Sequence, residues 1–138
     1  MTSMKKLLEV KILADIKYVR LIKNVTNNIL KKMGVSSKEK YMLNLAVAEA
    51  IANIIEHSYK YEKEKKIEYN IIGNKNEVKF ILIDNGDKVD KEKIKSRELE
   101  KYEEGGLGIF LIKKAMTKVE YIHLENGTKL EMTKTFKK

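Results

Sequence analysis

Three polar residues recur every four positions inside an apolar segment of the chain: Glu49, Asn53 and His57. In a helix, which turns by about 100° per residue, these side chains project along one side and lie over successive turns. A carboxylate one turn from a carboxamide oxygen can hold a hydrogen-bonded reactant or Mg²⁺, because hard cations take oxygen ligands. Alanines on either side leave room for a ligand to approach. The polar edge of an ordinary amphipathic helix is the alternative interpretation.

A second candidate lies where the apolar run 80–83 ends in Asp84, with Gly86 two residues further on. A carboxylate at the end of a strand can accept a hydrogen bond from an exocyclic amine, and a glycine lets the backbone pass close to a ligand. The same residue types also form ordinary turns, so this motif is weak when it stands alone.

Three glycines within four residues form a third candidate: Gly105, Gly106 and Gly108, with Leu107 between them. They lead directly into an apolar helical segment and would expose backbone N–H groups at a positively polarised helix start, as a phosphate requires. Neither the Gly-x-Gly-x-x-Gly dinucleotide fingerprint nor the Gly-Lys-Ser/Thr of a P-loop is present. A flexible hinge is the alternative.

The elements that must position these residues follow from hydrophobic periodicity and capping signals. The alternating segment 7–13 predicts a strand. Apolar residues at three- and four-residue steps from Ile16 to Met33 predict a helix, with Asp15 as its N-terminal cap and Gly34 as its C-cap. Ser36 and Glu39 have the capping-box form, which begins a second helix that runs to about Tyr59. The later predictions are strands over 66–73 and 77–84, a short helix over 90–100, a helix over 106–116, and a hairpin of 119–124 with 128–136.

This order of elements predicts an α+β fold: a two-layer sandwich of a mixed, mostly antiparallel sheet with helices on one face. The 138 residues fit one domain, 1–138. The chain has no cysteine, which excludes disulfides, thiolate metal sites and cysteine nucleophiles. No apolar run approaches the roughly 20 residues of a membrane helix and no signal peptide is recognisable, so we expect a cytoplasmic protein with no membrane partner.

The net charge of +9 favours an acidic partner. The excess is almost all lysine and is spread along the chain, whereas a nucleic-acid reader usually concentrates its basic residues on one element. We therefore expect the surplus to serve docking to an acidic protein surface, with no direct contact to nucleic acid.

Taken in chain order, the motifs resemble the four boxes of the GHKL (Bergerat-fold) ATPases. The correspondences are Glu49-x-x-x-Asn53-x-x-x-His57 with the N box, Asp84-x-Gly86 with the G1 box, Gly106-x-Gly108 with the G2 box, and Gly127-Thr128 with the G3 region. The resemblance extends over about 7–136, and the joint order is far more specific than any single box. Within the superfamily, segments 48–59 and 104–112 resemble the anti-sigma-factor serine kinases of bacteria, as does the short insert between Gly86 and Gly105.

That resemblance implies a protein that sequesters a sigma factor and uses ATP with Mg²⁺ to phosphorylate a serine or threonine on a STAS-fold antagonist. It also implies a homodimer as one form of the protein. By position, Glu49 would be the general base and Asn53 would ligate Mg²⁺. Asp84 would accept a hydrogen bond from the adenine amine, and Thr128 would complete a water-linked network around the base.

The resemblance also assigns the other nucleotide contacts, namely His57 at the end of the helix, Gly86 at the hinge, and Gly105, Gly106, Leu107 and Gly108 at the phosphates. Two positions differ from the family pattern: Lys88 replaces the usual second glycine of the G1 box, and Glu104 precedes the G2 glycines where some relatives have arginine. A non-catalytic nucleotide-binding switch of the same fold therefore stays open as an alternative. So do a histidine-kinase-type catalytic domain and, on charge alone, nucleic-acid binding.

Overall fold

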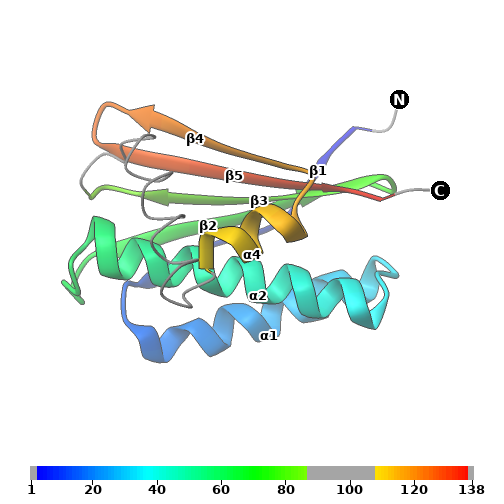
Figure 1. Cartoon of the computed structure of the whole chain (residues 1–138), viewed down its shortest axis with the longest axis horizontal. Coiled ribbons are helices and arrows are strands. Elements are labelled where there is room, and N and C mark those ends of the chain that lie inside the picture. The colour runs from blue at the N-terminus through cyan, green and yellow to red at the C-terminus, as the bar shows by residue number, and fades with distance from the viewer. Residues whose placement is uncertain (1–2, 87–107, 137–138) are drawn as a thin grey trace.

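The computed structural model describes residues 3–86 and 108–136, which form a five-stranded sheet with helices packed against it (Figure 1). The elements are β1 (Lys5–Leu13), the 3₁₀ turn η1 (Ile16–Tyr18), α1 (Val19–Lys32), α2 (Ser37–Asn53), the π-helical turn η2 (Ile54–Ser58), β2 (Lys66–Gly73), β3 (Glu77–Asp84), α4 (Gly108–Ala115), β4 (Lys118–Leu124) and β5 (Gly127–Thr135). The short helix predicted over 90–100 lies outside the described residues. In the described ranges, no helix is both long and apolar enough to cross a bilayer.

The strands follow one another across the sheet in the order β1-β2-β3-β5-β4, and all four pairings among the described strands are antiparallel. The helices α1, α2 and α4 lie together on one face of the sheet (Figure 1). Helix α2 packs against both α1 and α4. This arrangement confirms the predicted α+β two-layer sandwich with helices on one face.

The first helical segment has its predicted ends, but it begins with a 3₁₀ turn instead of a regular α-helix. Asp15 Oδ1 accepts a hydrogen bond from Lys17 N at 3.1 Å and caps a 3₁₀ turn, η1, which precedes α1. After α1, Gly34 has a φ of 82°, a conformation that costs glycine little. The turn lets Val35 N donate to Leu30 O at 3.1 Å, so the predicted glycine C-cap is confirmed.

The second helical segment begins as predicted, with Ser36 Oγ accepting from Glu39 N at 3.2 Å. The prediction of a regular helix to about Tyr59 is wrong after Asn53, because the backbone changes there to the π-helical turn η2. Tyr59 N donates to Ile54 O at 2.9 Å, which is an i→i+5 hydrogen bond. A π-turn holds more residues than an α-turn, so the side chains that follow Asn53 are rotated from their regular positions.

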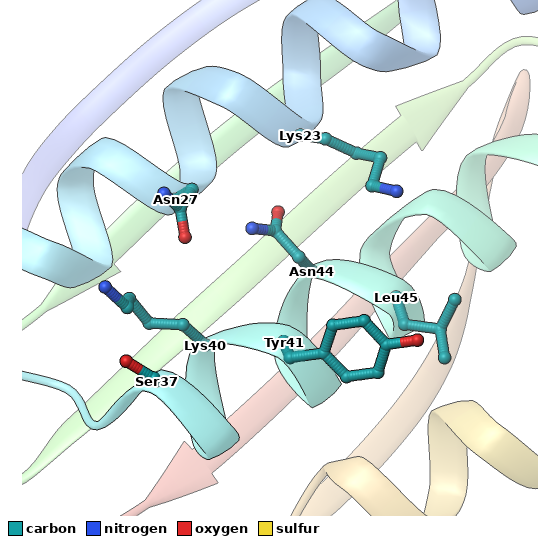
Figure 2. A pocket seen from close by; sticks show the side chains of 7 residues that line it. All are labelled: Lys23, Asn27, Ser37, Lys40, Tyr41, Asn44 and Leu45. Atoms are coloured by element: carbon teal, nitrogen blue, oxygen red, sulfur yellow. The ribbon is translucent and has the colours of Figure 1, made fainter.

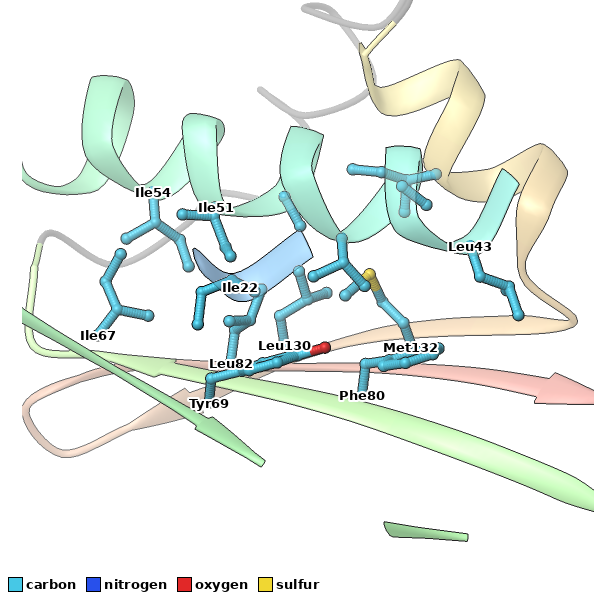
Figure 3. Close-up of a cluster of buried hydrophobic side chains, with 14 of the residues drawn as sticks. Ile22, Leu43, Ile51, Ile54, Ile67, Tyr69, Phe80, Leu82, Leu130 and Met132 are labelled. Carbon is cyan, nitrogen blue, oxygen red and sulfur yellow. The ribbon is translucent and has the colours of Figure 1, made fainter. Parts of the chain in front are cut away.

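The hydrophobic core fills the space between the helices and the sheet (Figure 3). One side of α2 and its continuation is buried, with Leu43, Val47, Ala50, Ile51 and Ile54 all at most 6% exposed. The largest fully buried side chains are Tyr69 and Phe80, which the sheet contributes.

A polar pair lies within this core. Thr26 of α1 and Tyr69 of β2 are both fully buried, and their hydroxyl oxygens are 2.7 Å apart. Burial raises the pKa of Tyr69 above its usual range. The hydrogen bond ties α1 to the sheet and satisfies two groups that would otherwise be orphaned.

The replacement Thr26→Val should lower the free energy of unfolding by about 1–3 kcal/mol, because it leaves the Tyr69 hydroxyl buried without a partner. Tyr69→Phe should cost less, since the Thr26 hydroxyl can bond to the carbonyl one turn earlier in α1. The double variant should lose less than the sum of the single losses. Urea unfolding of the four proteins measures these differences, and strict additivity would contradict the coupling.

Candidate functional site

The carboxylate of Asp84 lies at the end of a buried row on β3. Alternate residues of this strand, from Val78 through Phe80 and Leu82 to Asp84, face the core, and Asp84 is only 3% exposed. Its Oδ1 accepts a hydrogen bond from Gly86 N at 2.9 Å. Burial raises the pKa of Asp84 from its ordinary value of 3.8 to about 6, and the Gly86 hydrogen bond partly opposes that rise.

Thr128 of β5 is the direct cross-strand neighbour of Asp84. It is 2% exposed, and its Oγ1 has no hydrogen-bond partner within the described structure. A buried hydroxyl without a partner is rare in folded proteins, since it has given up its bonds to water. The structure therefore brings together two of the predicted site residues, one of which offers an unused polar group.

Gly127 allows this approach of the two strands. Its φ is 134°, and a Cβ atom at this position would lie 1.8 Å from the Asp84 carbonyl oxygen. No residue with a side chain fits there without moving the backbone of β3. The hairpin turn predicted across 125–127 is thus held directly against the end of β3.

The loop after β3 is packed equally closely against the end of η2. A Cβ atom at Gly86 would lie 2.4 Å from Ser58 O, so only glycine fits between the two segments. This contact brings the C-terminal end of the α2–η2 segment next to the end of β3.

Tyr59 reinforces the same contact, and sequence reasoning assigned it no role. The side chain is 2% exposed, and its hydroxyl donates to Lys66 O while it accepts from Asn85 N at 2.9 Å. Burial raises the pKa of Tyr59, and the charge of nearby Asp84 adds to the effect. The available signal was an aromatic residue two positions after His57, at the point where the polar face of the helix ends.

The three polar residues predicted for the second helix are divided between two elements. Glu49 and Asn53 lie one turn apart on α2, and both are half-buried. His57 lies in η2 instead, with its Nε2 3.7 Å from Oε2 of Glu56. The π-turn therefore breaks the regular four-residue spacing between Asn53 and His57, which the helical prediction assumed.

The glycine segment is only partly within the described residues. Gly105, Gly106 and Leu107 lie outside them, whereas Gly108 is the buried first residue of α4. Helix α4 packs against α2, the helix that carries Glu49 and Asn53. Among the described residues, no three His, Cys, Asp or Glu side chains are grouped as a metal site.

Replacing Asp84 by asparagine should stabilise the fold at pH 7.5 by about 1–3 kcal/mol, since it removes a buried charge and keeps the acceptor for Gly86 N. The folded state binds the Asp84 proton more tightly than the unfolded state does. Wild-type stability therefore falls as pH rises from 3.8 to about 6, and the advantage of Asp84→Asn should appear over that interval. Urea unfolding at several pH values tests this, and a difference that does not change with pH would contradict it.

Tyr59→Phe should destabilise the protein by about 1–3 kcal/mol and speed hydrogen exchange at the Asn85 amide, which loses its acceptor. Tyr61→Phe is the matched control, because Tyr61 is 64% exposed. Exchange measured by NMR should change at Asn85 far more than in the middle of β3. Equal exchange in both variants would show that the Tyr59 hydroxyl does not hold the loop.

Comparison with known proteins gives the chain its family. The model of the histidine kinase-like ATPase domain matches residues 12–134. The serine-protein kinase RsbW of Staphylococcus aureus strain MRSA252 is 30% identical over 149 aligned positions, which cover 100% of this chain and 92% of that relative. The protein of the same name from strain Newman matches with the same identity and coverage.

Two solved structures share the fold. The RsbU and RsbW domains of Rv1364c from Mycobacterium tuberculosis align with a TM-score of 0.65 and 16% identity, over 96% of this chain and 32% of that chain. The SiaB-SiaC complex from Pseudomonas aeruginosa aligns with a TM-score of 0.71 and 15% identity, over 93% of this chain and 89% of that chain. The chain therefore belongs to the histidine kinase-like ATPase domain family, which confirms the resemblance to the GHKL ATPases and to their anti-sigma-factor serine kinases.

Proposed function

We propose that this protein is an ATP-dependent serine/threonine protein kinase that also acts as a cytoplasmic anti-sigma factor. In this proposal it sequesters a sigma factor, phosphorylates a STAS-fold antagonist and works as a homodimer. The relationship to the serine-protein kinase RsbW supports the class of activity. The observation that carries ATP binding is the buried Asp84 carboxylate beside the Thr128 hydroxyl, for which the described structure holds no partner.

The Asp84 and Thr128 side chains fit the edge of an adenine base. Asp84 uses Oδ1 to accept the Gly86 N–H, and a carboxylate has further acceptor positions for an exocyclic amine. The Thr128 hydroxyl can donate to or accept from the base or a water beside it. Such a ligand would satisfy a group that is otherwise buried without a partner, which is worth about 1–3 kcal/mol.

Asn53 is the residue that we propose for Mg²⁺. The ion would neutralise charge on the phosphates and orient the transferred group. One carboxamide oxygen suits this ion, because Mg²⁺ usually keeps several waters and takes its other ligands from the substrate phosphates. The segment 105–108 would hold the phosphates through backbone N–H groups at the start of α4.

Glu49 is the proposed general base, one turn before Asn53 on α2. Its carboxylate would accept the proton of the substrate hydroxyl while the hydroxyl oxygen bonds to the γ-phosphorus of ATP. The bond from that phosphorus to the bridging oxygen of the β-phosphate would break, and ADP would leave. His57 would support the nucleotide end of this segment from η2.

The test is phosphate transfer from labelled ATP to a STAS-fold partner in the presence of Mg²⁺. Glu49→Gln should lower the transfer rate by about 10²- to 10⁴-fold, because it removes the base and keeps the shape of the side chain. Its affinity for ATP, measured by calorimetry, should stay near that of the wild type. Asn53→Ala should instead weaken Mg²⁺-dependent ATP binding.

Glu62→Gln is the control for a lost carboxylate, because Glu62 is exposed in the segment between η2 and β2. Undiminished transfer by Glu49→Gln would overturn the assignment of the base. Tight ATP binding without transfer to any STAS-fold partner would favour the non-catalytic switch. An acid-labile phosphoprotein would indicate a histidine-kinase-type activity.

A further inference from the structure

A pocket of about 320 Å³ lies between α1 and α2, and none of its lining residues belongs to the candidate site. Figure 2 looks onto the two helices with the sheet behind them, and both helices contribute side chains to the pocket. The lining residues are Lys23 and Asn27 of α1, and Ser37, Lys40, Tyr41, Asn44 and Leu45 of α2. We call this pocket the α1–α2 groove.

The α1–α2 groove is basic. Its only charged lining residues are Lys23 and Lys40, which come from opposite walls. In the described part of the chain, no carboxylate forms a salt bridge with either lysine. Helix α1 itself contains four basic residues and no acidic one. The groove therefore attracts negative charge, because no carboxylate of the described residues neutralises its cations.

Asn44 lies between the two lysines (Figure 2). Its Oδ1 is covered by protein and accepts no hydrogen bond in the described structure, so an occupant of the groove does not reach this atom. The two lysine ammonium groups are therefore the charged groups that the groove offers to a ligand.

The outer rim of the groove is partly apolar. The Tyr41 side chain is 69% exposed and lies beside Leu45 (Figure 2). An exposed tyrosine ring next to an apolar side chain is a common anchor for a protein partner, because it buries much area and retains a polar tip. An extended peptide combines the required features, since it offers acidic side chains next to apolar side chains.

We propose that the α1–α2 groove binds an acidic, extended segment of a partner protein. Its carboxylates pair with Lys23 and Lys40, and an apolar side chain packs on Tyr41. This inference goes beyond the proposed kinase function, because the groove shares no residue with the nucleotide site. Nucleic acid fits less well, since the groove has only two cations and no arginine among its lining residues.

The probe is a short fluorescein-labelled peptide in which aspartate alternates with leucine, and binding to the full chain is followed by anisotropy without nucleotide. The double variant Lys23→Gln/Lys40→Gln should weaken binding by about tenfold, since it removes two exposed ion pairs. Asn44→Asp should also weaken binding of the peptide, because it places a negative charge, which repels the peptide carboxylates, between the two lysines. Binding should also weaken as salt is raised.

The matched control is Lys63→Gln/Lys65→Gln, which removes the same charge from exposed positions in the segment before β2. It should bind the peptide as the wild type does, and thermal unfolding should confirm that all variants are folded. A peptide with asparagine in place of aspartate should bind far more weakly. Equal binding of the two peptides, equal loss in both lysine pairs, or complete displacement by a short single-stranded RNA would overturn the proposal.

Discussion

Burying an ionised carboxylate costs free energy, because the charge gives up its hydration. Asp84 bears this cost at the end of the core-facing row of β3, and its pKa near 6 reflects it. Within the described residues the surroundings only partly compensate, with one hydrogen bond from Gly86 N and a neighbouring Thr128 hydroxyl that has no partner there. The surrounding packing is what keeps the carboxylate in place. Such uncompensated polarity is typical of a binding site and unusual in a purely structural strand end.

The packing that holds Asp84 comes from both layers of the fold. The π-turn η2 carries Ser58 to the backbone of Gly86, and Tyr59 joins the start of β2 to the loop after β3. A regular helix would present these residues at a different angle. The turn thus connects the helix that bears Glu49 and Asn53 to the strand that bears Asp84. The local change from α- to π-helical hydrogen bonding therefore helps to set how α2 is placed relative to the end of β3 in the candidate site.

Much of this architecture could be predicted from sequence. The strand-like runs 66–73 and 77–84 predicted β2 and β3, and Ser36 with Glu39 predicted the start of α2. The π-turn could not be predicted, because periodicity arguments assume a constant rotation per residue and the apolar pattern of 54–55 fits either helix. The role of Tyr59 was missed for a similar reason. Its hydroxyl acts through partners at Lys66 and Asn85, which only the tertiary fold brings near.

The contact between Gly127 and the Asp84 carbonyl has a mechanical consequence. The two strands meet there backbone to backbone, so no side chain lies between them that could change rotamer and absorb a displacement. Among the described strands, β4 forms one outer edge of the sheet and reaches this contact through the turn into β5. A displacement of the β4–β5 hairpin at Gly127 must therefore move the backbone of Asp84 as well, because a change of side-chain rotamer cannot take it up.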